Sequence, residues 1–316
     1  MRNGKEWGLE AREGGFHIRG GANTGTAAER WARVLFTACA WTVILAVASI
    51  TLYMIANGLP AFFKIGWKEL LFGRVWAPTA AEPKFGILYV ILASLAGTAL
   101  AVLLGVPVGI LTAVYLAESG RPGAELVRQA VELLACIPSV IFGLLGVHLL
   151  SPLIYKLELR IFAGSDTHRF TGGANLLSAS LVLAVMILPT VIHMSEAAIR
   201  AVAPDIREAS LALGASGVQT IFQVVLPAAR PGIAAGAALG VGRAAGEAMA
   251  ITLVSGGSVN MPLPFESVRF LTTAIVGEMG YAQGVHRQVL FSIGLVLYLF
   301  IMAVNITLNR AVKEGK

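Results

Sequence analysis

Residues 176–195 read LLSASLVLAVMILPTVIHMS, a stretch of 20 residues without one Asp, Glu, Lys or Arg. A helix rises about 1.5 Å per residue, so this stretch is long enough to cross the hydrocarbon core of a bilayer, about 30 Å thick. Further long apolar runs cover residues 34–56, 86–116, 131–154, 232–255 and 289–309. The sequence therefore predicts an all-α polytopic membrane protein with six transmembrane helices.

The composition of the whole chain supports this prediction. Of its 316 residues, 56% are hydrophobic and only 13% are charged, and the mean hydropathy is +0.76. Soluble domains carry about 25% charged residues, so this chain lacks the polar surface that water requires. The net charge of +6 lies mainly in loops between the apolar runs. We therefore interpret it as a determinant of membrane topology, and we expect no nucleic-acid partner.

The distribution of Lys and Arg predicts the orientation in the membrane. Residues 1–30 are rich in Gly, Arg and Glu and are predicted to form a flexible tail, with residues 31–316 as the transmembrane domain. Residues 1–33, the loops near 117–130 and 196–231 and the C-terminus hold 14 Lys and Arg residues, against nine in the other three loops. Because cytoplasmic loops carry the excess of basic residues, both termini are predicted to be cytoplasmic.

The loop at 196–231 contains a short predicted helix. Pro204 and Asp205 favour a helix start, since Pro suits the first turn and Asp the positive end of the helix dipole. Gly214 and Gly217 are both residues that can end it. Taken physically, this is a helix too short and too polar to span a membrane, and an ordinary amphipathic connector would look similar.

The residue pattern in this loop is more specific than its helical character. Glu208-Ala209-Ser210 is followed by Gly214 and then by Val224-x-Leu226-Pro227. This arrangement resembles the EAA loop of ABC importer permeases, with Ser210 in place of the second Ala and Val224 in place of Ile. The resemblance implies a coupling helix that docks on a separate ATPase subunit, and therefore a cytoplasmic loop.

A charged pair lies inside the fifth apolar run. Arg243 is about eleven residues into it, near the predicted middle of the membrane, where a charge costs several kcal/mol and indicates a functional site. Glu247 lies one helical turn later on the same face, so it can pair with Arg243. The row formed by Gly232, Gly236 and Gly240 predicts close packing on a neighbouring helix. The pair is interpreted either as an ion pair that fixes packing or as an anion site, because the planar guanidinium can make two hydrogen bonds to an oxyanion.

The sequence around this pair narrows the family. Residues 242–250, Gly-Arg-Ala-Ala-Gly-Glu-Ala-Met-Ala, resemble the corresponding segment of phosphate importer permeases of the PstC type, with Ala248 in place of the usual Thr. Residues 137–144, Ile-Pro-Ser-Val-Ile-Phe-Gly-Leu, resemble the third span of the same permeases. The likeness covers roughly residues 50–305.

The resemblance implies a permease subunit of an ATP-driven phosphate importer in the bacterial inner membrane. It implies as partners a paralogous permease of the PstA type, a dimer of ATPase subunits of the PstB type and a periplasmic phosphate-binding protein of the PstS type. No cofactor is expected in this chain, with ATP and Mg bound by the ATPase. Two alternatives remain: an ABC permease for molybdate, sulfate or tungstate, and a phosphate-sensing membrane scaffold.

Two loops are given a plainer interpretation. Residues 255–258, Ser-Gly-Gly-Ser, resemble part of the ABC ATPase signature, but the chain contains no GxxxxGK[ST] phosphate-binding loop. The segment is therefore predicted to be a flexible turn, and the chain is not expected to be an enzyme. Residues 166–169, Asp-Thr-His-Arg, are predicted to be a solvated loop.

Overall fold

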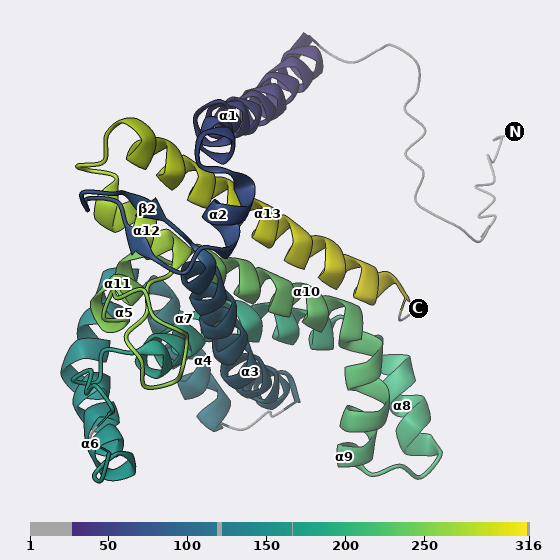
Figure 1. Cartoon of the computed structure of the whole chain (residues 1–316). Helices are drawn as coiled ribbons and strands as arrows, with labels where there is room; N and C mark the ends of the chain where they lie inside the picture. The colour runs from purple at the N-terminus through teal and green to yellow at the C-terminus, as the bar shows by residue number, and fades with distance from the viewer. Residues whose placement is uncertain (1–26, 119–121, 166, 315–316) are drawn as a thin grey trace, which may run out of the picture. The chain divides into compact units, whose positions relative to one another are not determined.

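A computed structural model describes residues 27–118, 122–165 and 167–314 (Figure 1). The chain divides into two compact units, Met1–Thr51 and Leu52–Lys316. Helix α1 (Ala27–Ile65) supplies the described residues of the first unit and the beginning of the second. The predicted tail, residues 1–30, lies outside the described residues except for its last four, which begin α1.

Six helical segments in the described part of the chain are long and apolar enough to cross a membrane, which confirms the predicted number. They are Glu29–Ile65 of α1, Leu88–Glu118 (α3), Ser139–Ile161, Leu176–Arg200 (α7), Gly217–Gly246 and Gly284–Thr307, which belongs to α13 (Gly284–Glu314). The shorter helices are α2 (Trp67–Phe72), α4 (Pro122–Cys136), α8 (Pro204–Ala212), α11 (Met249–Val254) and α12 (Leu271–Glu278). The one two-stranded sheet in the described residues pairs β1 (Trp76–Ala77) with β2 (Lys84–Phe85), antiparallel.

The third predicted span is interrupted. The run 131–154 was expected to be one helix, but α4 ends at Cys136 and a new helix begins at Ser139. Pro138 lies between them in an extended conformation. The helix is interrupted here because proline has no N–H to donate and disfavours helical geometry in the residue before it. From Ser139 the chain continues through α5 (Ser139–Leu145), a π-helical turn (Gly146–Leu150) and α6 (Ser151–Ile161).

The fifth predicted span is also broken. The span begins with α9 (Gly217–Thr220) and continues through a π-helical turn (Ile221–Val225) and α10 (Leu226–Gly246). The helix then stops, because Glu247 is extended, with φ −71° and ψ 135°. The chain restarts as α11 two residues later, so the expectation of one continuous helix over 232–255 is wrong.

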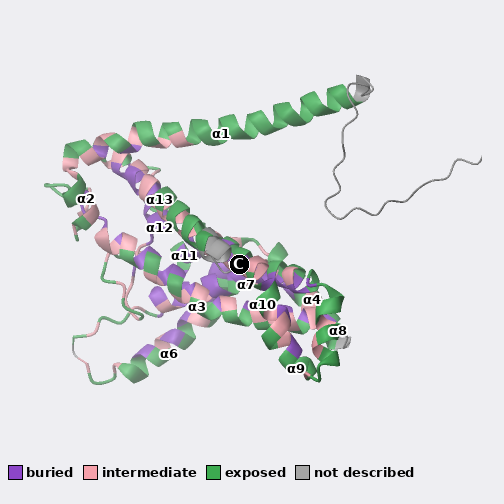
Figure 2. Cartoon of the chain, turned by 90° about the vertical axis from the view of Figure 1, so that its right-hand side faces the viewer, coloured by how far each residue is buried: buried purple, intermediate pink, exposed green. Residues whose placement is uncertain are grey.

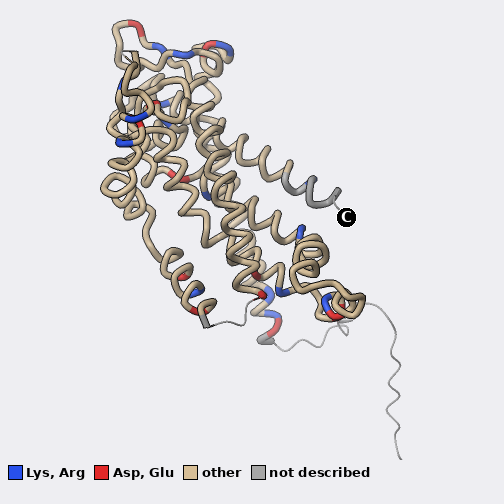
Figure 3. Tube along the Cα trace, turned by 90° about the horizontal axis from the view of Figure 1, so that it is seen from below, with Lys and Arg blue, Asp and Glu red and all other residues tan. Residues whose placement is uncertain are grey.

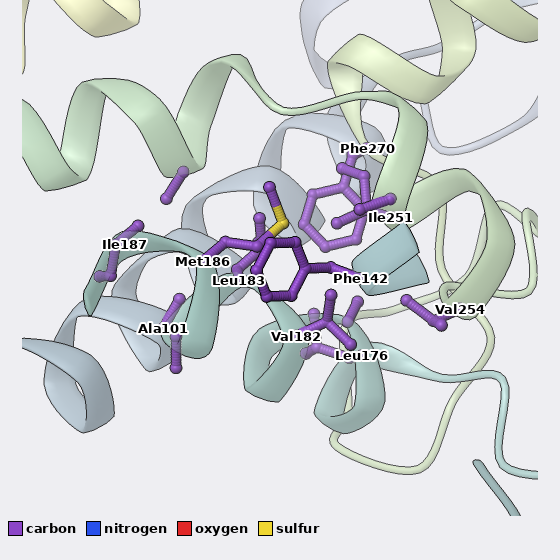
Figure 4. Close-up of a cluster of buried hydrophobic side chains, with 14 of the residues drawn as sticks. Ala101, Phe142, Leu176, Val182, Leu183, Met186, Ile187, Ile251, Val254 and Phe270 are labelled. Carbon is purple, nitrogen blue, oxygen red and sulfur yellow. The ribbon is translucent and has the colours of Figure 1, made fainter. Parts of the chain in front are cut away.

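Helix α7 is the centre of the second unit. In its most apolar window 67% of residues are buried, against 22% to 28% in the second, third, fifth and sixth spans. Glycines let α3 and α10 approach it closely: a Cβ on Gly109 would lie 2.7 Å from Val191 Cγ1, and one on Gly240 would lie 3.0 Å from Val191 Cγ2. The predicted close packing at the α10 glycine row is confirmed. Buried residues gather where α3, α7 and α10 meet (Figure 2), around a cluster that includes Phe142, Leu183 and Met186 (Figure 4).

Two ends of this helical layer carry most of its charge (Figure 3). The α8 end consists of residues 201–216 and the helix ends beside them. The hairpin end consists of residues 66–87, 167–175 and 255–283. Helices α3 and α7 run from the hairpin end to the α8 end, and α10 runs back. The long stretches between the two ends are nearly free of charge, as a membrane interior requires.

Candidate functional site

The α8 end contains the short helix predicted from the sequence. Pro204 occupies the first turn of α8 and Asp205 follows it, as expected. Gly214 ends the helix with φ +89°, a left-handed conformation that glycine adopts without strain. The amide of Gly214 donates to the carbonyl of Leu211 at 2.9 Å, and that of Ala215 to Ser210 at 3.2 Å. The terminal carbonyls of α8 are thereby satisfied inside the loop.

Gly217 has a different role from the predicted one. It is the first residue of α9 and ends no helix. The side chain of Ser216 accepts from the Gln219 amide at 3.3 Å, and the Gln219 side chain accepts from the Ser216 amide at 2.8 Å. This reciprocal cap starts a new helix that continues into the fifth span, so α8 and the span are separate rigid pieces joined at Gly214.

The residues of the EAA-like motif lie on both sides of this joint. Glu208, Ala209 and Gly214 are exposed, and α8 buries none of its residues against the rest of the chain. The hydroxyls of Ser210 and Thr220 lie 2.9 Å apart and tie α8 to α9. Leu226 is partly buried against the core beside α3 and α7, and Pro227 lies in the first turn of α10.

Helix α8 also presents apolar side chains to the outside. Leu213 is 91% exposed, Leu211 is 50% exposed and Val218, on the adjacent α9, is 66% exposed. Together with Glu208 they form a surface that no described part of the chain covers. Apolar residues gathered on a short polar loop are typical of a protein-docking surface.

Arg207, which the sequence interpretation did not single out, fastens α8 to two spans. Its Nη1 donates to the Glu118 carboxylate at the end of α3. Its Nη2 donates to the carbonyl of Ile199 near the end of α7, at 2.6 Å. Glu118 is 89 residues from Arg207 along the chain and Ile199 is eight, and the fold brings the three helix ends together.

A second cluster at the same end centres on Glu196 of α7. Its Oε1 accepts from Arg128 Nη2 of α4 at 2.6 Å and from Arg200 Nε at 2.9 Å. Arg200 Nη2 also donates to the carbonyl of Leu116 in α3 at 2.8 Å. The hydrogen bond to Glu196 raises the pKa of Arg128 above its ordinary value. The Glu196–Arg200 pair is readable from its helical spacing, whereas Arg128 lies 68 residues away and gives no local signal.

Arg243 lies where the fifth span breaks, halfway along α7. Helices α7 and α10 run antiparallel, with Gly232 against Ala198, Gly236 against Met194 and Gly240 against Val191. Continuing this series brings Arg243 level with residues 187 and 188, the midpoint of Leu176–Arg200. The side chain of Arg243 is exposed in this chain.

Glu247 does not pair with Arg243. Among the described residues no ion pair joins the two, because α10 ends between them and Glu247 leaves the helical path. The Glu247 carboxylate accepts from the Ala250 amide at 3.0 Å, and its carbonyl accepts from Thr272 Oγ1 at 2.6 Å. Glu247 therefore caps the start of α11, and its two bonds stabilise the break between α10 and α11.

The predicted solvated loop at 166–169 is confirmed at Thr167 and Arg169, which are exposed, and is wrong at His168. Asp166 lies outside the described residues. The side chain of His168 is only 8% exposed, and its Nε2 lies 2.8 Å from Oε1 of the fully buried Glu158. The ring of His168 stacks on Phe162 at 3.8 Å between centroids. His168 is therefore packed inside the hairpin end.

Six apolar spans, a broken helix at mid-depth and an exposed short helix between the fourth and fifth spans define the class: an ABC importer permease. The chain belongs to the family of binding-protein-dependent transport system inner membrane components, whose model matches residues 105–313. It is a multi-pass integral membrane subunit, and its relatives are transport subunits.

Individual relatives agree with this family. The chain is 37% identical to the probable ABC transporter permease protein YqgH of Bacillus subtilis, over 88% of this chain and 90% of that protein. It is 29% identical to the phosphate transport system permease protein PstC of Pasteurella multocida, over 87% of this chain and 90% of that protein. A bacterial alginate ABC transporter in complex with a pentasaccharide-bound periplasmic protein has the same fold, with a TM-score of 0.62 at 21% identity, over 89% of this chain and 94% of that one.

Proposed function

We propose that this chain is the permease subunit of an inorganic phosphate importer. The single observation that carries the proposal is Arg243, an exposed cation at mid-depth where the fifth span breaks. The PstC-type sequence around it and the relatives named as phosphate permeases support phosphate as the anion.

The broken helix favours a substrate path over a purely structural charge. Non-helical backbone at membrane depth is tolerated where it is buried in protein or lines a water-filled cavity. Broken helices of this kind carry substrate sites in other transporters. A guanidinium facing lipid at this depth would cost several kcal/mol. We therefore infer that the exposed face of Arg243 is covered by a second, PstA-type permease, with the path between the two.

The guanidinium suits a tetrahedral oxyanion. Its planar fork can donate two parallel hydrogen bonds to two oxygens of phosphate, and it stays charged at any physiological pH. In a site partly shielded from water, this attraction offsets the cost of removing the anion from bulk solvent. Arg243 thus lowers the barrier for the anion at the middle of its path.

The α8 end is the proposed ATPase contact. The exposed Leu211 and Leu213 with Glu208 form the docking surface for an ATPase subunit of the PstB type, which binds ATP and Mg. The proposal therefore has the α8 end and both termini in the cytoplasm, and a PstS-type phosphate-binding protein at the hairpin end. Arg207 then transmits the displacement of α8 to α3 and α7, because it bonds to both.

The test is ATP-dependent uptake of radiolabelled phosphate into proteoliposomes that contain this chain, the second permease, the ATPase and the binding protein. We expect uptake that molybdate and sulfate do not compete for. Arg243→Ala should reduce it to background, Arg243→Lys should retain part of it, and Arg287→Ala, which removes an exposed charge near the start of α13, should leave it unchanged.

Other outcomes separate the alternatives. Uptake of molybdate or sulfate in place of phosphate would keep the permease assignment and overturn the substrate. An assembled complex that moves none of the three anions would favour a sensing scaffold. Glu208→Lys should stop ATP-driven uptake without preventing insertion of the chain, and normal uptake by Arg243→Ala would refute the site.

A further inference from the structure

A second cationic hollow lies at the hairpin end, away from Arg243. Its volume is about 370 Å³, within the range of small-molecule sites. One wall comes from the chain between α2 and β1, and the other from the chain between α11 and α12. The lining residues are Arg74, Val75, Trp76, Gly257, Ser258, Val259 and Arg269. Two arginines from segments far apart in the sequence therefore face one small space.

Arg269 is held in place with donors to spare. Its Nε donates to the Gly257 carbonyl at 2.7 Å, and its Nη1 donates to the Glu278 carboxylate. A guanidinium has five N–H groups, so three of those on Arg269 are not used by these two bonds. Its side chain is 26% exposed, which leaves it accessible from the hollow.

Glu278 lies behind Arg269 with its oxygens occupied. Oε1 accepts from Trp76 Nε1 at 2.9 Å as well as from Arg269, and Oε2 lies 2.7 Å from His286 Nε2. The carboxylate is only 8% exposed. Arg74, Arg269 and Glu278 together carry a net charge of +1. The carboxylate therefore orients Arg269 without cancelling the positive charge of the hollow.

The wall beside Arg269 is preformed. Gly256 and Gly257 both have left-handed φ values, 83° and 81°. The Val268 amide donates to the Ser255 carbonyl at 2.8 Å, and the Gly257 amide donates to the Val268 carbonyl at 3.1 Å. The expected flexible turn at 255–258 is thus an ordered element, which presents Ser258 and the carbonyl that anchors Arg269.

Arg74 supplies the unmatched charge. Its side chain is exposed, and no described residue bonds to it. Its backbone is fixed on both sides, because the Gly73 amide donates to Glu69 and the Gly86 amide donates to Val75, each at 2.9 Å. All five of its N–H groups are available to a ligand at a defined position in the chain.

We propose that this hollow is an oxyanion-binding site, separate from Arg243, which receives phosphate before it enters the membrane path. The proposal rests on the proposed function for the identity of the anion. Two guanidinium groups provide planar pairs of donors for a tetrahedral oxyanion, and the Ser258 hydroxyl adds a neutral donor. The preformed wall lowers the entropic cost of binding, since the site does not have to be ordered by its ligand.

The experiment measures binding without transport. The complex of this chain, the second permease and the ATPase is prepared in nanodiscs with Arg243→Ala, which removes the mid-depth site, and without the periplasmic binding protein. Equilibrium dialysis with radiolabelled inorganic phosphate should still detect binding. Adding Arg74→Ala should raise the Kd at least about tenfold, which corresponds to about 1.4 kcal/mol. The Kd of Arg74→Lys should lie between the Kd values with Arg74 and with Arg74→Ala. Arg287→Ala, which removes an exposed arginine near the start of α13, should change the Kd less than about twofold.

The outcomes distinguish this inference from the proposed function. If the unmodified complex takes up no phosphate, the proposed function is wrong. Normal uptake with a phosphate Kd that Arg74→Ala leaves unchanged would overturn this site alone. If Arg74→Ala leaves the phosphate Kd unchanged but weakens association with the binding protein when that protein is added back, the hollow holds a carboxylate of that partner and the proposal of a phosphate site is wrong.

Discussion

Replacement of Arg207 tests how α8 is connected to the spans. Arg207→Ala removes one bond to the Glu118 carboxylate and one to the Ile199 carbonyl. The Ser210–Thr220 contact at 2.9 Å remains and still ties α8 to α9. Helix α8 should therefore stay attached to the fifth span but lose its side-chain anchor to the ends of α3 and α7.

The size of the effect follows from the exposure of the partners. The side chains of Arg207 and Glu118 are 24% and 20% exposed, so solvent screening reduces their ion pair to about 1 kcal/mol. The bond to the carbonyl contributes about 1 kcal/mol more. Loss of about 2 kcal/mol changes the ratio of attached to detached α8 about 30-fold.

Hydrogen exchange measures this directly, because the opening free energy of a segment sets the exchange of its amides. In the purified chain, the α8 amides that depend on this anchor should exchange up to about 30-fold faster in Arg207→Ala. Arg230→Ala, an exposed arginine in α10 with no bond to another described residue, should leave them unchanged. In the reconstituted importer, Arg207→Ala should reduce transport per ATP hydrolysed more than it reduces ATP hydrolysis. Unchanged α8 exchange would refute the anchoring role, and unchanged transport would refute its part in coupling.

Two further substitutions test the centre of the fold and the break in the fifth span. Gly109→Ala would place a Cβ 2.7 Å from Val191 Cγ1, so we expect it to destabilise the chain by about 1–3 kcal/mol in thermal unfolding. Gly277→Ala, where nothing lies within 4 Å of the new Cβ, is its control, and equal melting temperatures would contradict the packing argument. Glu247→Gln keeps an oxygen for the Ala250 amide, so its stability should be close to that of the unmodified chain, whereas Glu247→Ala should lose about 0.5–2 kcal/mol. A stable Glu247→Ala protein would show that this cap does not hold the break.

Local features at the α8 end could be predicted well from the sequence. Pro204 at the start of α8 and Gly214 at its end act through their own backbone geometry, which does not depend on distant residues. Gly217 was misassigned because glycine is compatible with either a helix end or a helix start. The reciprocal cap between Ser216 and Gln219 decided between the two.

The connections between helices had no comparable signal. Arg207 and Glu118 are 89 residues apart, and neither the helical period nor a motif relates them. The two arginines of the hairpin-end hollow are likewise brought together by the packing of separate segments. The expected Arg243–Glu247 pair failed for the same reason: helical spacing applies only while the helix continues, and α10 ends at Gly246.

The sequence by itself determined the six apolar spans, the short helix between the fourth and fifth, and the family of the chain. Hydrophobic run length is set by bilayer thickness, and caps and turns are set by neighbouring residues. Only the tertiary structure decided where the spans break, which ends are tied together and which charges face one another. Those features depend on contacts between residues far apart in the chain, whose approach is fixed by the close packing of α3 and α10 on α7.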